Sequence, residues 1–467
     1  MDSTRKNAMT QIKSCIQISE DGELDSYLIK ILSSEPCYTI INECRKYRSR
    51  LFTPLTTILL FIQQVLSQDK SCRNALAKLI ALQFVSKVKE CSHNIGAYCQ
   101  ARMRIPESTV TDLVQTTGSL STKNIPAKWQ LFGLDFKLID GTTVRMADSK
   151  ENKKQFTQYA NQKEGVGFPA ARLVVIMSLA LGSVLHYAIG PHKGKGSGEH
   201  GLLRTLFSYI NSGDAFLADR YYPSYFLLDY FISVGANGIF KAQTQRKYDF
   251  KKGKRLGPND HIVEWHRPPK PDWMDQETYD ATAPMIQIRE FIVAGRIYVT
   301  TFLDKEKFSR KAMAAVYQQR WYIELNLRSI KSVMKMKMLS CKTPEMVKKE
   351  IGIHFLAYNL IRIIIAEASI QHDAIPNKIS FKSAVQVINA FTPYFNNHDN
   401  EKNMRMYGDI LALIVQNKVG TRPGRIEPRA NKDRGSTLPL LKGPRGTERE
   451  KIMLQQAKKQ AERVSYA

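Results

Sequence analysis

Hydrophobic residues recur every three or four positions through the first 125 residues, and strand-like alternation does not occur there. The clearest stretches are 55–66 and 75–88, where this spacing places the apolar side chains on one face of a helix. The pattern predicts a helical N-terminal domain over residues 1–125. The stretch 96–106, GAYCQARMRIP, adds basic residues that either contact DNA phosphates or form the solvated rim of a structural domain.

From about residue 130 the pattern becomes one of strands alternating with helices. Residues 131–146 alternate between apolar and polar positions, and 171–190 is typical of a hairpin turned near Gly182-Ser183. We then expect a helix at 198–210, a short buried strand in DAFLADRYY, a helix at 223–234 with Pro223 at its start, and a strand in NGIFKAQ. This order predicts an α/β layer with a mixed sheet.

Residues 244–302 interrupt the alternation and have the composition of a β-rich insertion. They contain the basic run 246–255 and two alternating segments, 285–293 and 295–302, which meet at Ala294-Gly295. Helical spacing returns at 308–336, 345–370 and 380–418, and a charged helix is expected at 448–464. The predicted organisation is a helical N-terminal domain (1–125), two parts of one α/β core (126–243 and 303–375) separated by the insertion (244–302), and a helical, basic C-terminal region (376–467).

The segment YQQRWYIELNLRSIK, residues 317–331, contains no Gly or Pro and is predicted to be helical. At about 100° per residue, four of its polar side chains form one stripe about 60° wide. The stripe consists of Tyr317, Arg320, Glu324 and Lys331. The neighbouring apolar stripe consists of Val316, Ile323, Leu327, Ile330 and Met334. Such a helix can pack on one side and present a carboxylate between two cations, although a solvated helix face has the same pattern. Trp321 is expected to face the core.

The net charge narrows the class of partner. The 467 residues include 69 Lys and Arg against 43 Asp and Glu, a formal net charge of +26. This balance favours a polyanion, either nucleic acid or an anionic membrane surface. The longest apolar run, 51–66, is too short to span a bilayer, no signal-peptide pattern begins the chain, and no amphipathic stretch combines a basic face with an aromatic one. We therefore expect a soluble cytoplasmic protein that acts on nucleic acid.

Two further patterns argue against other chemistries. The seven cysteines are scattered without CxxC or Cys/His spacing, so reduced core cysteines are expected rather than a zinc site. The run 190–200, GPHKGKGSGEH, does not fit a phosphate-binding loop, because position 195 is Lys where the second Gly is needed. We interpret this run as a flexible turn into a helix.

Two aspartates qualify as metal ligands by their place on predicted strands. Asp140 ends the alternating run that begins at Leu134, and Asp219 follows the buried stretch AFLA. Acids at the ends of buried strands are held in place by the sheet, and Mg²⁺ needs only a few carboxylates because it keeps several waters. Considered singly, each has a simpler explanation: a turn after Asp140, or an ion pair between Asp219 and Arg220.

Taken together with Glu324, the two aspartates form a recognisable order of strand Asp, strand Asp and helical Glu, with a β insertion before the third acid. In this order the chain resembles the IS-four-type insertion-sequence transposases, a family of bacterial DDE enzymes. The family motif Y-x2-R-x3-E-x6-K is met in full by residues 317–331. The blocks LIDGTTVRMADSKEN, FLADRYYPSY and GSGEHGLLRTL are also similar to family segments, and the resemblance covers roughly residues 45–446.

The resemblance implies an RNase H-like core with a β-rich insertion and a catalytic, metal-binding triad of Asp140, Asp219 and Glu324. It implies a DNA transposase that binds the ends of an insertion sequence, cuts them with Mg²⁺ or Mn²⁺ and joins the 3′-OH ends to target DNA. In the family, the Tyr, Arg and Lys of the helix motif contact end phosphates. This role carries over to Tyr317, Arg320 and Lys331.

Some relatives form a DNA hairpin and flip a base onto aromatic residues. Trp265 and Trp273 in the insertion are the candidates for such stacking, with packing inside the insertion as the alternative.

Further DNA contacts are expected from basic residues near the second Asp, in the insertion and in the C-terminal region, each with solvated surface charge as its alternative. They are Arg220, Arg246, Lys247, Lys251, Lys252, Lys254, Arg255, Arg422, Arg425, Arg429 and Arg434.

Because a transposon has two ends to pair, we expect a homodimer on double-stranded DNA, with the C-terminal helix as a candidate contact. We expect the protein in the cytoplasm, near the nucleoid. The alternatives are an RNase H-like nuclease without strand transfer and a catalytically silent DNA-binding protein derived from a transposase.

Overall fold

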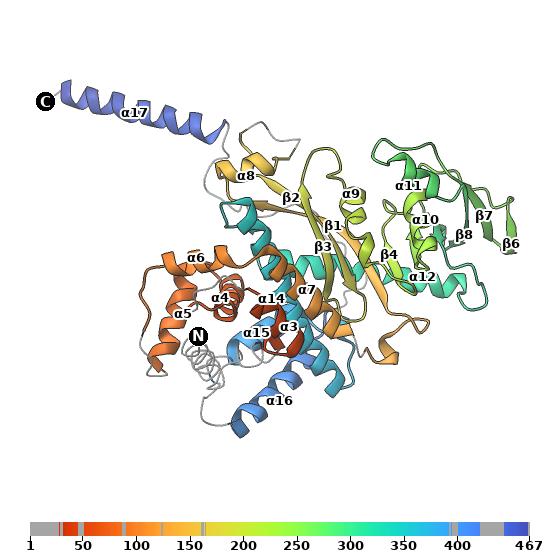
Figure 1. Ribbon diagram of the computed structural model, residues 1–467, viewed down its shortest axis with the longest axis horizontal. Coiled ribbons are helices and arrows are strands. Elements are labelled where there is room, and N and C mark those ends of the chain that lie inside the picture. The colour runs from red at the N-terminus through yellow and green to blue at the C-terminus, as the bar shows by residue number, and fades with distance from the viewer. Residues whose placement is uncertain are drawn as a thin grey trace.

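Helices make up the N-terminal part of the chain, as the spacing of its apolar residues predicts. The computed structural model describes residues 28, 31–44, 51–85, 90–122, 125–159, 163, 165–391, 394, 400–420 and 443–465. The N-terminal helices are α3 (Glu35–Asn42), α4 (Pro54–Leu66), α5 (Cys72–Val85), α6 (Gly96–Arg104) and α7 (Glu107–Thr122). Helix α4 begins at Pro54 because the Thr53 hydroxyl accepts a hydrogen bond from the Thr56 N–H at 3.1 Å. Helices α4 and α7 pack against the long helix α14 (Pro344–Gln371) (Figure 1).

A ten-stranded sheet runs through the rest of the molecule in the order β3-β2-β1-β4-β5-β9-β8-β7-β6, and β10 also pairs with β1. The strands are β1 (Phe136–Met146), β2 (Ala170–Ser178), β3 (Val184–Pro191), β4 (Ala215–Ala218), β5 (Asn237–Lys241), β6 (Lys254–Gly257), β7 (Asp260–His266), β8 (Met285–Val293), β9 (Arg296–Thr300) and β10 (Met338–Leu339). Strands β1, β4 and β5 are parallel neighbours, β10 is parallel to β1, and the other pairs are antiparallel. The sheet is mixed, as the sequence predicts.

The two faces of the sheet are covered by different helices. On one face, Ile139 and Phe216 pack with α9 (Glu199–Arg204) and α10 (Tyr225–Ser233). On the other face, Phe136, Leu138 and Leu217 pack with the helices that include α14. Alternate residues of β1 thus belong to opposite hydrophobic clusters, so Asp140 shares the face of Phe136 and Leu138.

Two helices on the first face differ in extent from the sequence expectation. The helix expected at 198–210 ends at Arg204, because the Thr205 and Leu206 N–H groups bond to carbonyls only three residues back, which tightens the chain toward the 3₁₀ turn Phe207–Tyr209. Helix α10 begins after Ser224, so Pro223 precedes the helix instead of starting it.

The insertion continues the same sheet. The predicted hairpin is present as β8 and β9, joined at Ala294 and Gly295, whose φ angles of 49° and 69° suit a two-residue hairpin turn. Strand β9 also pairs with β5, and β7 and β6 extend the sheet away from the core, with α11 (Gln276–Ala281) beside them (Figure 1). The insertion is therefore anchored to the core by β5–β9 backbone hydrogen bonds.

The segment 317–331 is not one continuous helix, which corrects the sequence expectation. It comprises the end of α12 (Arg310–Gln318), α13 (Trp321–Arg328) and most of a π-helical turn (Ser329–Val333). Between α12 and α13 the Gln319 and Arg320 N–H groups bond three residues back, so the turn there is tighter than α-helical. The apolar stripe is nevertheless buried, whereas Trp321 is 49 % exposed, so the expectation that it faces the core was wrong.

The C-terminal region is helical where the structure describes it. Helices α15 (Phe381–Phe391) and α16 (Asn400–Gln416) pack near α14, and α17 (Arg445–Ser465) projects away from the molecule (Figure 1). The short elements are η1 (Ala127–Trp129), α8 (Lys150–Gln155) and η4 (Pro376–Lys378). By length and composition alone α14 could cross a membrane, but most of it is buried inside the protein, so its apolar character is that of a core helix.

Candidate active site

Asp140 and Asp219 lie side by side on neighbouring parallel strands. In the register of β1 and β4, Leu138 is opposite Leu217, so the chains bring the two aspartates to the same level beyond the last paired residues. Strand β1 continues to Met146, so Asp140 lies within the strand and does not end it. The Gly141 N–H donates to Asp140 Oδ1 at 2.8 Å, and the Tyr221 N–H donates to Asp219 Oδ1 at 2.8 Å. Neither acid occupies the simple turn or the ion pair with Arg220 that the sequence left open.

Burial and neighbouring charges perturb the titration of Asp140. Burial raises the pKa of Asp140 to about 7, and the nearby anions Asp219 and Glu199 add to the rise, while the Gly141 N–H and Arg320 oppose it. An ionised Asp140 is therefore only partly compensated by the protein groups around it.

Glu324 and Arg320 are joined to each other in this arrangement. The Arg320 Nη2 donates to Glu324 Oε1 at 2.6 Å, one helical turn away. The guanidinium also lies close enough to Asp140 to lower the pKa of that acid. Arg320 thus links Glu324 of the motif helix to Asp140 on β1.

Tyr317 and Lys331 reach the same region from either end of the motif segment. Burial raises the pKa of Tyr317 to about 12, and the Tyr317 ring packs edge-on against Tyr298 at 5.3 Å. The Lys331 ammonium donates to the Thr142 hydroxyl at 3.0 Å, two residues after Asp140 on β1. Burial lowers the pKa of Lys331, as do the nearby cations Lys337 and Arg145. The polar stripe therefore faces the strand acids despite the irregular helix.

Two cations that sequence reasoning missed line a cavity together with Asp219. Lys241 ends β5 and Arg296 begins β9, and the pairing of these strands brings them to one cavity of about 400 Å³. The cavity is lined by Asp219, Arg220, Lys241, Arg296, Tyr298, Tyr317, Gln318, Arg320 and Trp321. The pKa of Lys241 is lowered, first by desolvation and then by Arg220, Arg296 and Arg320. Each residue is a single cation at a strand end, so only the β5–β9 pairing identifies the cluster.

A further acid, Glu199, was also missed. It is the first residue of α9, in the run that we interpreted as a flexible turn into a helix. Its carboxyl group accepts a hydrogen bond from the Tyr222 hydroxyl at 3.1 Å. Burial raises its pKa, Asp219 adds to the rise, and the Tyr222 hydrogen bond and Arg172 oppose it. The sequence signal for Glu199 was its position in the block GSGEHGLLRTL, which is similar to a family segment.

The acids provide the kind of oxygen ligands that a divalent metal prefers, but among the described residues they do not form a complete metal-binding group. Carboxylate oxygens are the ligands that Mg²⁺ and Mn²⁺ prefer, and Asp140 and Asp219 supply them from adjacent strands. Glu324, the third acid of the motif, is held by Arg320. Within the described parts of the chain, no three Asp, Glu, His or Cys side chains form a metal-binding group. The ion pair with Arg320 engages one oxygen of the Glu324 carboxylate.

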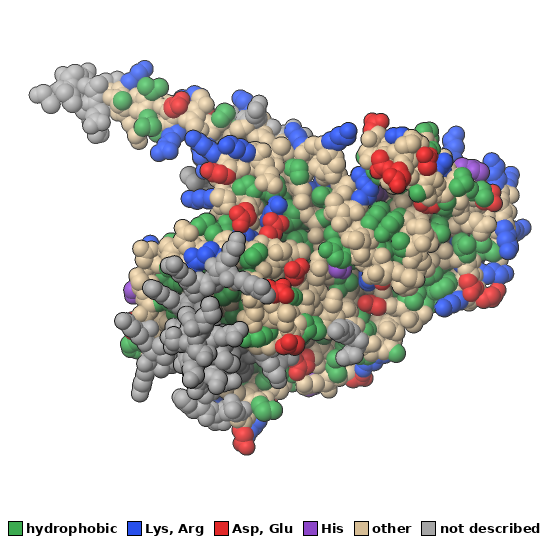
Figure 2. All heavy atoms as spheres, viewed as in Figure 1, with side chains coloured by type: hydrophobic (Ala, Val, Ile, Leu, Met, Phe, Trp, Pro, Cys, Tyr) green, Lys and Arg blue, Asp and Glu red, His purple; other side chains and the backbone are tan. Residues whose placement is uncertain are grey.

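The insertion presents basic residues at its far end. Four of them are exposed on and just before β6: Lys251, Lys252, Lys254 and Arg255. Figure 2 shows Lys and Arg side chains gathered at this end of the molecule.

Arg246 lies over the Trp265 ring at 3.4 Å. Trp265 is 3 % exposed and donates to Glu290 Oε1 at 2.8 Å, so it packs within the insertion and is not available to stack on a base.

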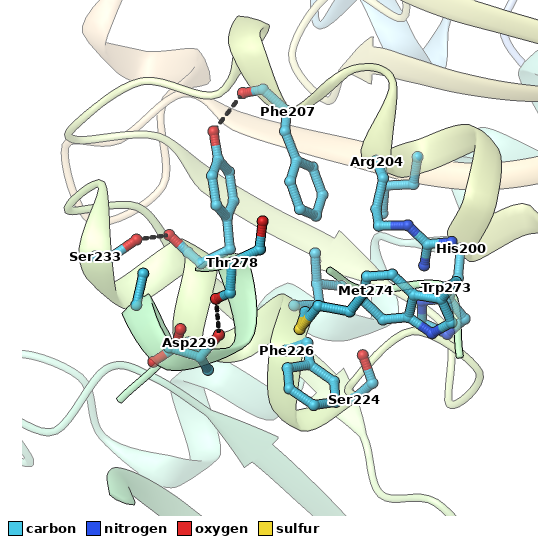
Figure 3. Close-up of a pocket in the computed structure, with 15 residues that line it drawn as sticks. His200, Arg204, Phe207, Ser224, Phe226, Asp229, Ser233, Trp273, Met274 and Thr278 are labelled. Carbon is cyan, nitrogen blue, oxygen red and sulfur yellow. Dashed lines mark hydrogen bonds between the residues drawn. The ribbon is translucent and has the colours of Figure 1, made fainter. Parts of the chain in front are cut away.

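Trp273 lies at a cavity of about 340 Å³ between α9, α10 and the insertion (Figure 3). It is 41 % exposed, and the Arg204 guanidinium lies over its ring at 3.7 Å. Phe226 meets the ring edge-on at 5.7 Å. Trp273 is thus the more accessible of the two predicted stacking residues, with Arg204 as its present partner.

The predicted contacts Arg422, Arg425, Arg429 and Arg434 lie outside the described residues.

Known proteins with similar sequences are transposases. The family model described as "Transposase DDE domain" matches residues 132–360, which include both aspartates and the whole helix motif. The transposase InsG of insertion sequence element IS4 from Escherichia coli K12 is 25 % identical over 347 residues, 73 % of this chain and 76 % of that protein. The putative transposase InsL of element IS186A, also from E. coli K12, is 33 % identical over 81 residues, 17 % of this chain and 22 % of that protein.

Among solved structures, the piggyBac transposase in a synaptic complex with hairpin DNA aligns with a TM-score of 0.41 and 10 % identity over 83 % of each chain. The family match over residues 132–360 and the alignment with the IS4 transposase over 73 % of this chain together support one assignment, an IS4-type DDE transposase.

Proposed function

We propose that the protein binds the ends of an insertion sequence, cuts them by metal-dependent phosphodiester hydrolysis and joins the freed 3′-OH ends to target DNA. The observation that carries this proposal is the convergence of Asp140, Asp219 and the Arg320–Glu324 pair at one edge of the parallel strands. The strand order, with β1, β2 and β3 antiparallel and β4 and β5 parallel to β1, supports an RNase H-like core.

Asp140, Asp219 and Glu324 would hold Mg²⁺ or Mn²⁺. Such ions, when bound, activate the attacking oxygen and neutralise charge on the leaving oxygen. The placement of Asp140 and Asp219 at the same level of neighbouring parallel strands supports this assignment.

Arg320 has two roles in the proposal. In the protein alone it neutralises Glu324, and on DNA its planar guanidinium binds an end phosphate in the fork geometry that suits phosphate oxygens. Because one guanidinium cannot serve both anions fully, phosphate binding weakens its hold on Glu324. The end of the element thereby favours completion of the acidic triad.

The other basic residues of the site, together with Tyr317, position the DNA. Tyr317 and Lys331 flank the acids, and Lys241, Arg296 and Arg220 line the neighbouring cavity, so phosphates on both sides of the scissile bond have partners. Trp273 is the stacking candidate for a flipped base. The insertion cations extend the interface away from the acids, and a second copy of the protein would bind the second end.

Cleavage of a duplex that carries the element's end, measured with Mg²⁺ and with Mn²⁺, tests the proposal. We expect cleavage by the wild-type protein and none by Asp140→Ala. A wild-type protein that binds the end and never cuts it would instead be a silent DNA-binding derivative.

Strand transfer separates the transposase from the alternative nuclease. A precut end incubated with target DNA should become covalently joined to it in the presence of a divalent metal. Cleavage without any joining, with either metal, would favour an RNase H-like nuclease.

A further inference from the structure

Glu199 stands between the two chain segments that supply the aspartates. It begins α9, on the face of the sheet opposite α14. The loop before it is fixed, because the Arg172 Nη1 on β2 donates to the Ser197 carbonyl at 2.9 Å. The Glu199 carboxyl group is therefore held at a defined position relative to the strands.

Its first contact is with the residue after Asp140. A Cβ atom built on Gly141 would lie 2.2 Å from Glu199 Cδ, far inside van der Waals contact. The carboxyl group thus occupies the space that a Cβ atom would fill at this position of β1, so any larger residue there would displace it. Because the Gly141 N–H also donates to Asp140, the contact lies against the peptide that orients that acid.

Its second contact is with the segment after Asp219. The hydroxyl of Tyr222, a residue with 0 % exposure, donates to Glu199 Oε2 at 3.1 Å. Tyr222 follows Asp219 by three residues, and its N–H bonds to the Asp219 carbonyl at 3.3 Å. A buried tyrosine hydroxyl needs a partner, and an ionised carboxylate is a strong one.

We propose that Glu199 is a positioning residue of the reaction site, which holds the Asp140 and Asp219 segments at a fixed spacing through Gly141 on one side and Tyr222 on the other. This role rests on the proposed DNA-cutting function. The role requires a planar side chain with an acceptor oxygen at this position, and Arg172 offsets part of the charge of the carboxylate.

Three variants and one control test whether the contacts of Glu199 hold the two aspartate segments at a fixed spacing. Tyr222→Phe removes one hydrogen bond, Glu199→Ala removes both contacts, and Glu199→Gln keeps the size and the acceptor oxygen. Tyr407→Phe is the matched control, because it removes a tyrosine–glutamate hydrogen bond (to Glu367, 2.8 Å) between α16 and α14. Each protein is checked for folding by thermal melting.

The readouts are the Mn²⁺ concentration for half-maximal cleavage and amide hydrogen exchange of peptides 136–146 and 215–222. We expect Glu199→Ala and Tyr222→Phe to need about tenfold more Mn²⁺, the size of effect usual for residues that orient metal ligands. Both peptides should exchange faster, Glu199→Gln should recover most of the wild-type behaviour, and Tyr407→Phe should match the wild type.

Two results would overturn the proposal. Glu199→Ala and Tyr222→Phe could behave like the control in exchange and in cleavage. Alternatively, Glu199→Gln could be as impaired as Glu199→Ala, which would make the charge, and not the contact, the important property. If the wild type does not cut DNA at all, the proposed function fails, and the exchange data still decide the positioning role.

Discussion

In the protein without DNA, Arg320 forms an ion pair with Glu324 and lies near Asp140. It pairs with Glu324 at 2.6 Å and lowers the pKa of Asp140, so one guanidinium faces acids from the motif helix and from β1. The Arg320 side chain is 19 % exposed and that of Glu324 is 35 % exposed, so both remain accessible to an incoming phosphate. At the scale of single residues, substitutions of these two side chains should have different consequences.

Glu324→Gln should abolish cleavage and leave end binding nearly intact, because it removes a metal-binding charge and no DNA contact. The loss of rate should exceed the roughly 10–100-fold cost of substituting a residue that only orients a ligand. Arg320→Ala should also weaken end binding. Cleavage rates and fluorescence-anisotropy titrations on one end-containing duplex measure both effects. Cleavage by Glu324→Gln at the wild-type rate would refute the role of Glu324.

Asp140 should make stability depend on pH when no divalent metal is present. Its folded pKa of about 7 lies above the value near 3.9 for an unfolded aspartate, so its stabilising contribution is complete below about pH 4 and is lost as the pH rises through 7. Asp140→Asn, which stays neutral, should therefore melt about 1–3 °C above the wild type at pH 8 in EDTA.

The same comparison at pH 4.5 should show a much smaller difference between Asp140→Asn and the wild type. Calorimetry at the two pH values measures it. Added Mn²⁺ should stabilise the wild type more than the variant, because the metal binds the folded protein through Asp140. An equal difference at both pH values would contradict the assigned pKa.

At the scale of elements, the β5–β9 pairing and the broken motif helix place the cations. The tight turn at Gln319 and Arg320 and the π-helical turn at Ser329–Val333 change the angular spacing along the segment, yet Lys331 still reaches Thr142 on β1. The segment on and just before β6 carries a separate group of exposed cations, Lys251, Lys252, Lys254 and Arg255, at the far end of the insertion. This second group should affect DNA affinity more than chemistry.

The double substitution Lys251→Gln with Lys252→Gln should weaken DNA binding and leave the cleavage rate at saturating protein nearly unchanged. Each lost phosphate contact lowers the slope of log affinity against log salt by about 0.9, so the slope should fall by up to about 2. The control is Lys378→Gln with Lys382→Gln, two exposed lysines near α15. Equal slopes for the two double variants would remove this part of the insertion from the DNA interface.

At the scale of the whole molecule, α17 is the element least engaged with the rest of the described chain. It projects outward, and Ile452, Met453 and Leu454 on it are 54 %, 59 % and 64 % exposed (Figure 1). Consecutive exposed apolar side chains on a projecting helix suit a contact with another protein surface. In the proposed function a second copy of the protein binds the second end, and this helix is our candidate for the contact between the two copies.

Ile452→Glu combined with Met453→Glu should leave binding to one DNA end unchanged and reduce the complex that contains two proteins and two ends. Light scattering of the DNA complex gives its mass, and a gel assay with two ends of different length detects pairing. The control is Lys458→Gln on the same helix, which changes the charge of an exposed position and leaves the apolar side chains in place. Normal pairing by the double variant would exclude this helix from the contact.

The sequence by itself located the main helices and strands and identified Asp140, Asp219 and Glu324 as candidate acids. Apolar periodicity located the N-terminal helices, the β2–β3 and β8–β9 hairpins and the buried stripe of the motif segment, because burial requires those side chains on one face. The motif spacing, joined to the two Asp blocks, identified the family. These features are local or depend on fixed spacing, so a linear pattern contains them.

Only the tertiary structure decided what meets at the site. Lys241, Arg296 and Glu199 join the aspartates through strand pairing and the packing of α9, contacts between segments distant in sequence. Trp321 is exposed and Trp265 buried for the same reason: a side chain's surroundings depend on which segments pack against it. Local spacing cannot encode those partners, whereas the three-dimensional packing of the sheet and its helices fixes them.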